Sequence, residues 1–118
     1  MIAWAGHSRA TAPAWRDIVY IAMNRFRIAR GREEVFEELW RKRDSYLDEV
    51  PGFREFHLLK GPSDDECSLY ASHTVWENKA AFVAWTESDA FHKAHAQARA
   101  PQGTYLGHPD FEGFEVVI

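Results

Sequence analysis

The chain has 118 residues, of which 46% are hydrophobic and 27% are charged, and its formal net charge is −4 at pH 7. These values indicate one globular domain and exclude a disordered chain, and without an apolar run of about 18 residues no membrane-spanning helix is expected. The negative charge argues against a nucleic-acid-binding protein, which usually has a basic face. A single cysteine, Cys67, excludes an internal disulfide and favours a reducing, cytoplasmic location.

Residues 1–17 show no hydrophobic period and are dominated by Ala, Gly, Ser, Thr and Pro. A secretory signal would need a basic start and a continuous apolar stretch, and Gly6 to Arg9 interrupt any such stretch. We therefore expect an N-terminal extension, which Trp4 and Trp15 could dock onto a domain of residues 18–118.

The first half of that domain reads as strand, helix, strand. Residues 18–28 are apolar on both parities at first, which predicts a strand covered on both faces. Apolar residues then recur every three or four positions, which predicts a helix over 32–49 that Pro51-Gly52 ends. A second strand is predicted over 53–60.

The second half continues the alternation. It contains a turn over 61–65, a strand over 67–76, a helix over 79–85, a helix that Ser88 caps and that runs to about Ala98, a loop over 101–109 and a strand over 111–118. The order β-α-β-β-α-β is that of a ferredoxin-like α+β domain, a four-stranded sheet with its helices on one face.

The other face of this sheet would be too apolar to remain in water. We expect it to carry Val19, Ile21, Met23 and Tyr70 together with part of the last strand. A two-fold homodimer in which two sheets pack face to face, a dimeric α/β barrel, would bury this surface.

Asn24 is the polar residue that fits its predicted place least well. It lies in the middle of the first strand, where asparagine is unfavourable and where a buried amide without partners costs about 1–3 kcal/mol. The amide either bonds to backbone or a neighbouring helix, or it faces a ligand.

The last helix carries two histidines with different surroundings. Phe91, Ala94 and His95 share one apolar stripe, whereas His92 is rotated away from it. His95 is therefore either a structural histidine or a ligand. A metal site made of His92 and His95 alone would lack a carboxylate or a thiolate and would be weak. The Gly-rich fingerprints of flavin and nicotinamide sites do not occur, so this chain is not expected to bind either cofactor.

Several of these residues form one pattern with fixed spacing. It reads Trp76-Glu77-x-x-x-Ala81-Phe82-x-x-Trp85-x-x-Ser88-x-x-Phe91-x-x-x-His95, after the strand with Asn24 and after Pro51-Gly52-Phe53. Over residues 18–118 the chain resembles the antibiotic biosynthesis monooxygenase superfamily, and within it the haem-degrading branch of IsdG-type monooxygenases. The Trp-Glu segment is shared widely in the superfamily, whereas Asn24, Trp85 and His95 stand where the haem branch has its Asn, Trp and His.

The resemblance implies that the protein opens the porphyrin ring of haem and releases iron, with haem as both substrate and cofactor. His95 would be the axial ligand of the haem iron. Asn24 would donate a hydrogen bond on the distal side, and Trp85 would press on the macrocycle and distort it. Electrons would come from an external donor, through a separate reductase.

The walls of the pocket are less specific. Phe36, Trp40 and Phe91 are either pocket walls or only core between helix and sheet. The haem propionates need a basic partner, for which the candidates are Arg43, Arg25, Lys93 and Arg99. The loop over 101–109 differs from the loops of the best-matched members, and its His108 is either a second ligand or has no role.

Two other functions stay open at this point. The first is a cofactor-independent monooxygenase acting on a polyphenol or quinone, with Asn24, Trp85 and His95 lining an organic pocket. The second is a haem carrier without turnover, in which His95 ligates iron in the same way.

Overall fold

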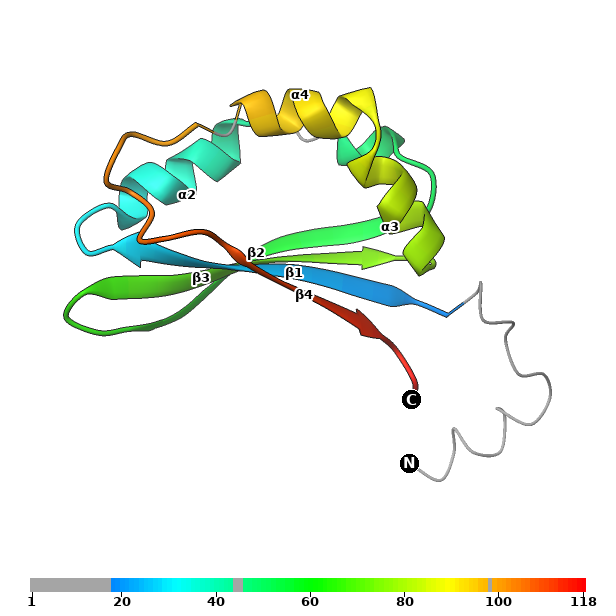
Figure 1. The fold of residues 1–118 in the computed structure, drawn as a ribbon, viewed down its shortest axis with the longest axis horizontal. Helices are drawn as coiled ribbons and strands as arrows, with labels where there is room; N and C mark the ends of the chain where they lie inside the picture. The colour runs from blue at the N-terminus through cyan, green and yellow to red at the C-terminus, as the bar shows by residue number, and fades with distance from the viewer. Residues whose placement is uncertain (1–17, 44–45, 98) are drawn as a thin grey trace.

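The computed structural model describes residues 18–43, 46–97 and 99–118 (Figure 1). The elements are β1 (Tyr20–Ala29), α2 (Glu33–Lys42), the 3-10 turn η2 (Leu47–Glu49), β2 (Phe53–Ser63), β3 (Cys67–Trp76), α3 (Lys79–Thr86), α4 (Asp89–Gln97) and β4 (Asp110–Glu115). The expected extension over 1–17, with Trp4 and Trp15, lies outside the described residues.

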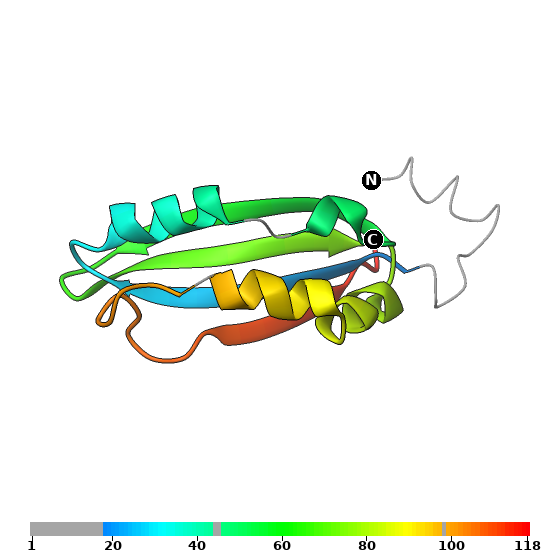
Figure 2. The ribbon, with the colours of Figure 1, turned by 90° about the horizontal axis from the view of Figure 1, so that it is seen from above.

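The strands form one antiparallel sheet in the order β2-β3-β1-β4. Helices α2, α3 and α4 lie on the same side of this sheet, and Figure 2 shows α2 over the β2 side and α4 over the β1 side. This arrangement confirms the predicted ferredoxin-like α+β fold. None of the described helices is long and apolar enough to cross a membrane.

The helix predicted over 32–49 is wrong in extent. The α-helix ends at Lys42, and Leu47–Glu49 form a separate 3-10 turn. Arg43 has extended backbone angles, and Tyr46 lies in the left-handed region at φ 59°, so a continuous right-handed helix cannot pass through either residue. The apolar spacing hides this break because Leu47 is buried on both interpretations.

The hairpin between β2 and β3 is longer than predicted. β2 runs to Ser63 instead of ending at residue 60, with an irregularity in its register, and the turn shortens accordingly. Asp64 stabilises the turn, because its Oδ1 accepts hydrogen bonds from the backbone N–H groups of Glu66 (2.8 Å) and Cys67 (2.9 Å). The same bonds lower the pKa of the Asp64 carboxyl.

The face of the sheet beneath the helices holds the core. Phe26 and Tyr70 pair across β1 and β3, and both pack against Phe36 of α2. Tyr70 was expected on the uncovered face, but it is 1% exposed and its hydroxyl donates to Glu37. The register explains the error, because a residue directly opposite Phe26 must share the face of Phe26.

The opposite face of the sheet is not covered by any described residue. It carries Ile21, Met23 and Val75 at its centre, and Leu59 and Phe114, which are 42% and 48% exposed, toward its edges. Ile21 and Met23 therefore lie as expected on a face that no described helix covers, but the same face also carries charged residues, among them Arg25 and Glu112.

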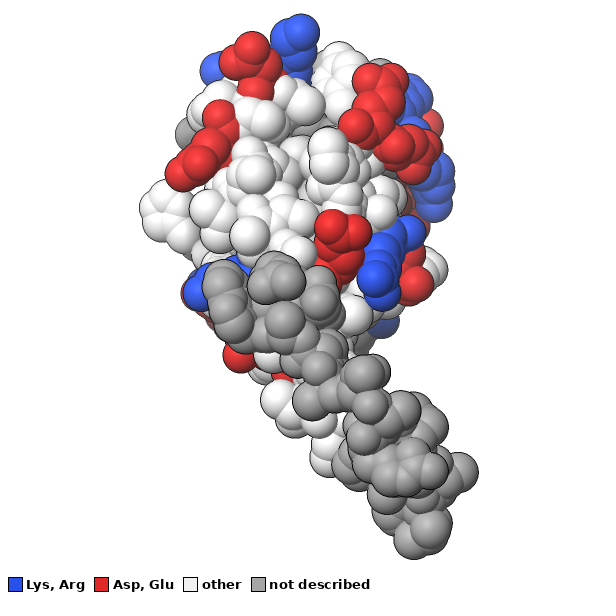
Figure 3. Space-filling model, turned by 90° about the vertical axis from the view of Figure 1, so that its right-hand side faces the viewer, with Lys and Arg blue, Asp and Glu red and all other residues white. Residues whose placement is uncertain are grey.

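Side chains cap both C-terminal helices at their first turns. Asn78 Oδ1 accepts a hydrogen bond from the Ala81 N–H (2.8 Å), and Ser88 Oγ accepts one from the Phe91 N–H (3.2 Å), as predicted for Ser88. Figure 3 views the end of the molecule next to α3, where uncharged side chains fill the centre and charged ones surround them. The composition of α3 agrees with this, since Lys79 is its single charged residue.

Gly52 directly precedes β2 and packs closely against Ala81 of α3, so a substitution there tests the packing of α3 on the sheet. Its φ is +83°, and a Cβ there would lie 2.5 Å from Cβ of Ala81. Gly31 has a similar φ of +92° with nothing within 4 Å of the added atom, so it is a matched control. We predict that Gly31→Ala costs about 1–2 kcal/mol of unfolding free energy from backbone strain alone. Gly52→Ala should cost about 1–3 kcal/mol more because of overpacking.

Urea unfolding of both variants measures this difference. Equal losses at the two positions would show that α3 moves away freely and that Gly52 does not fix it.

Candidate functional site

A cavity of about 770 Å³ lies between the helices and the sheet. This volume falls within the range of about 300–1,000 Å³ that is usual for small-molecule sites. Its floor comes from β1 and β3, and its walls come from α2, α3, α4 and the segment after α4. The cavity therefore brings together residues that are up to 89 positions apart, from Ala22 to Phe111.

The floor of the cavity is polar at its centre. Asn24 lies directly opposite Ser72 on β3 and opposite Phe111 on β4, and all three residues line the cavity. Within the described part of the chain, no hydrogen-bond partner of the Asn24 side chain is found. The interpretation of Asn24 as an amide bonded to backbone or helix is therefore not supported, and the side chain offers a donor and an acceptor to the cavity.

His95 reaches the cavity from α4. Its Nδ1 lies 2.9 Å from the carbonyl oxygen of Phe91, one turn earlier. Because a carbonyl only accepts, Nδ1 carries the proton and Nε2 keeps its lone pair, which is the tautomer that a ligand to a metal needs. His92 is exposed and does not line the cavity, as its predicted orientation implied.

Trp85 is both a core residue and a cavity wall. It is 9% exposed and packs against Trp76, with ring centroids 5.4 Å apart. Phe91 meets it in a T-shaped contact at 4.8 Å and lines the same wall. The indole Nε1 of Trp85 is buried and has no hydrogen-bond partner in the described residues. The wall is rigid, because neighbouring rings hold the indole from several sides.

Arg43 places a cation at the opposite wall. Its guanidinium carbon lies 4.2 Å from the centre of the Trp40 ring, in cation–π contact. Its Nε is buried with no hydrogen-bond partner, and no ion pair of Arg43 is found among the described residues. Burial lowers the pKa of Arg43, and it raises the pKa of the neighbouring Tyr105 hydroxyl. Since a guanidinium remains charged in proteins, this wall favours an anionic group on a bound molecule.

Phe36 was expected among the pocket walls, and the structure places it elsewhere. It is 0% exposed and lies behind the wall, in contact with the rings of Trp40 and Tyr105. Trp40 lines the cavity itself, stacked on Phe56 at 5.5 Å. Phe36 therefore supports the wall without reaching the cavity.

The other basic candidates do not reach the cavity. Arg25 lies on the uncovered face of the sheet, where its Nε is 3.0 Å from a carboxylate oxygen of Glu112. Lys93 and Arg99 are exposed and are not part of the lining. Of the basic residues considered from the sequence, Arg43 is the one that the fold brings to the cavity.

The segment over 101–109 closes the remaining side. Tyr105 forms an isolated antiparallel bridge with Ile28, and the Leu106 N–H donates to the carbonyl of Arg27 (2.8 Å). These bonds hold the segment against the end of β1 and bring Tyr105 and His108 to the cavity. His108 thus remains a second candidate ligand.

Other lining residues escaped the sequence reasoning. They include Leu47, Phe56, Ser72, Thr74, Tyr105 and Phe111. The two β3 hydroxyl residues had a usable signal, because their parity is that of the buried Trp76. The others reach the cavity through long-range packing, which leaves no local pattern.

Comparison with known proteins agrees with this architecture. The sequence profile of the antibiotic biosynthesis monooxygenase family matches residues 19–97. A relative from Staphylococcus haemolyticus, named heme oxygenase (staphylobilin-producing), is 30% identical over 77 residues, which make up 65% of this chain and 73% of that protein.

Two solved structures are similar over most of the chain. One is the heme-degrader MhuD from Mycobacterium tuberculosis with two hemes bound in its active site, at 30% identity and a TM-score of 0.66, covering 84% of this chain and 96% of that one. The other is SnoaB, a cofactor-independent oxygenase from Streptomyces nogalater, at 20% identity and a TM-score of 0.61, covering 82% and 91%. This second likeness supports the fold alone. The family profile covers more than half of the chain, and the chain therefore belongs to the antibiotic biosynthesis monooxygenase family.

Proposed function

We propose that the protein is a haem-degrading monooxygenase of the IsdG type, which binds haem in the cavity and opens its porphyrin ring to release iron. The observation that carries the proposal is the meeting of three groups in one aromatic-walled cavity. These groups are the imidazole of His95, the amide of Asn24 and the guanidinium of Arg43, and within the described residues neither the Asn24 amide nor the Arg43 guanidinium has a hydrogen-bond or ion-pair partner. The haem-degrading relatives at 30% identity support it.

The residues present fit haem in both shape and charge. A macrocycle is flat and apolar, and Trp40, Trp85 and Phe91 offer ring surfaces around it. The propionates are anions, and the buried Nε–H of Arg43 has no acceptor among the residues that the structure describes. A carboxylate there would satisfy that orphaned donor and neutralise the buried charge.

His95 would hold the iron. The hydrogen bond from Nδ1 to the Phe91 carbonyl fixes the orientation of the ring and leaves Nε2 as the atom that would bind the iron. The imidazole of His95 would be a rigid ligand. Its ring contacts the ring of Phe91 one helical turn earlier, with centroids 3.9 Å apart, and this contact restricts rotation of the side chain.

Asn24 and Trp85 would increase the rate of haem oxidation. Bound haem supplies an iron that activates oxygen, and haem is itself the molecule oxidised. The Asn24 amide offers an N–H donor on the floor of the cavity. A donor fixed in this way lowers the activation barrier of a reaction in which negative charge develops within hydrogen-bonding distance of it. The Trp85 indole is held in place by its ring contacts with Trp76 and Phe91. A macrocycle bound against it would therefore be distorted, because the indole cannot move aside.

Two partners belong to the proposal. An external donor, through a separate reductase, would supply the electrons. A second copy of the chain would cover the uncovered face of the sheet, sheet against sheet, because the exposed apolar side chains of Leu59 and Phe114 favour burial.

Sedimentation tests the dimer. The wild type should sediment as a dimer at micromolar concentration, and Phe114→Asp should shift it toward monomer, because a charge would enter the apolar interface. Val83→Asp is the control, since Val83 is a similarly exposed apolar residue on α3, at 39%. A wild-type monomer, or equal effects of both changes, would contradict the proposed assembly.

Haem titration tests the ligand. We predict that His95→Ala weakens haem binding at least about tenfold and shifts the Soret band, because it removes the iron ligand. His92→Ala is the control on the same helix and should leave the spectrum unchanged, since His92 does not line the cavity. Loss of ligation in His108→Ala, with His95→Ala silent, would assign the iron to the other cavity histidine.

Degradation with haem and ascorbate tests the reaction. The wild type should lose its Soret band and release iron. Asn24→Ala should keep its haem affinity but slow this loss about 10- to 100-fold, since a hydrogen bond to a charged acceptor is worth about 1.5–3 kcal/mol. Trp85→Phe keeps an aromatic wall and should also slow turnover more than it weakens binding.

The same assay separates the other functions. A stable Soret complex without iron release would indicate a haem carrier. Absence of haem binding would indicate an organic substrate such as a quinone or polyphenol. Both results would contradict the proposal.

A further inference from the structure

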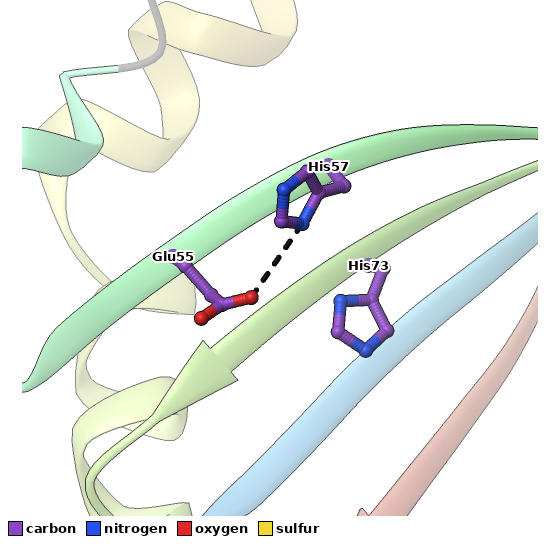
Figure 4. A group of neighbouring side chains, drawn as sticks. All are labelled: Glu55, His57 and His73. Atoms are coloured by element: carbon purple, nitrogen blue, oxygen red, sulfur yellow. Dashed lines mark ion pairs between the residues drawn. The ribbon is translucent and has the colours of Figure 1, made fainter.

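Two histidines and a glutamate meet on the face of the sheet opposite the cavity. Glu55 and His57 belong to β2 and His73 to β3 (Figure 4). His57 lies directly opposite His73 in the antiparallel register. Glu55 precedes His57 by two residues, and alternate residues of a strand share one face, so the three side chains lie together.

The distances within this group suit a shared ion. One ligand atom from each residue can be chosen such that all three lie within 4.8 Å of one another, and His57 Nδ1 is 3.6 Å from Glu55 Oε2. Two ligands of one zinc ion, each about 2.0–2.2 Å from it, lie no more than about 4.4 Å apart. In the single chain the side chains of Glu55 and His57 are 55% and 60% exposed, so small rotations can close the remaining gap without disturbing the core beneath the helices.

The carboxylate of Glu55 is not paired with a lysine or arginine among the described residues, so it can bind a metal cation. Two other carboxylates of the face are already paired, Glu112 with Arg25 at 3.0 Å and Asp110 with Arg27 at 3.4 Å. Glu55 differs from them, because within the described residues its ion pairing is with His57 and with no lysine or arginine. A cation between Glu55 and the imidazoles would therefore meet an anion that has no permanent positive partner.

We propose that Glu55, His57 and His73 form a binding site for one divalent transition-metal ion such as Zn²⁺. Two imidazole nitrogens and one carboxylate oxygen are a donor set that zinc takes in proteins, with water completing a tetrahedron. The donors come from neighbouring strands of one sheet, so the backbone fixes their spacing before the ion arrives. The ion would link the edge strand β2 to β3 in addition to their backbone hydrogen bonds.

This site is separate from the cavity and does not rest on the proposed haem chemistry. It lies on the sheet face that the proposed second copy of the chain would cover, so in that dimer the ion would be held between the two sheets. Phe56 lies between Glu55 and His57 in the chain and lines the cavity on the other side of the sheet. Ser72 and Thr74 flank His73 and also line it. The sheet itself thus stands between the metal group and His95.

Calorimetric titration of the tag-free protein with ZnCl₂ tests the site. We expect one Zn²⁺ per chain, with affinity reduced at least about tenfold by His57→Ala and by His73→Ala, because each removes a ligand. Glu55→Gln should also weaken binding, because it removes the charge while keeping the shape. Far-UV circular dichroism and thermal melting without metal check that each variant is folded.

Two control variants identify binding elsewhere. His92→Ala removes an exposed histidine outside the group and should change nothing. His95→Ala removes a cavity histidine and should leave Zn²⁺ affinity intact. Zn²⁺ affinity unchanged in both His57→Ala and His73→Ala, loss of binding in His95→Ala, or no binding by the wild type would each overturn the proposal.

Discussion

The pairing of β1 with β3 is the constraint on which the rest of the structure depends. It sets Asn24 opposite Ser72 and Phe26 opposite Tyr70, on the face beneath the helices. A slip of one residue would turn every side chain of β1 to the other face, so that Asn24 would leave the cavity and Met23 would enter it. The large rings of Tyr70 and Trp76 oppose such a slip, because both are almost completely buried in this register.

The polar atoms around the cavity lower the free energy of unfolding, and packing in the rest of the core must offset this loss. The Nε1 atoms of Trp40 and Trp85 and the Nε of Arg43 are buried without partners in the described residues. An unsatisfied buried polar group costs about 1–3 kcal/mol, and more when it is charged. Three of the four atoms of this kind among the described residues, all except Thr104 Oγ1, belong to residues that line one cavity, which is the pattern of a site prepared for a ligand with its own acceptors.

The sequence predicts a feature of the fold or the site when the residues that determine it lie close together in the chain. Asn24 stood out because a polar residue interrupts an apolar strand, and His95 because it shares a helix stripe with Phe91. The break after Lys42 stayed hidden because Leu47 continues the apolar spacing beyond it. Tyr105 needs a bridge to Ile28 across the fold, and the group of His57 and His73 needs the strand register, which residue patterns alone do not provide.

The proposed haem site lies in one cavity between His95 and Arg43. A crystal structure of the haem complex tests it most directly. We predict a bond from iron to Nε2 of His95, a propionate on the Arg43 guanidinium and the macrocycle against Trp85. Haem bound through His108 with the propionates away from Arg43, or haem bound outside the cavity, would contradict it.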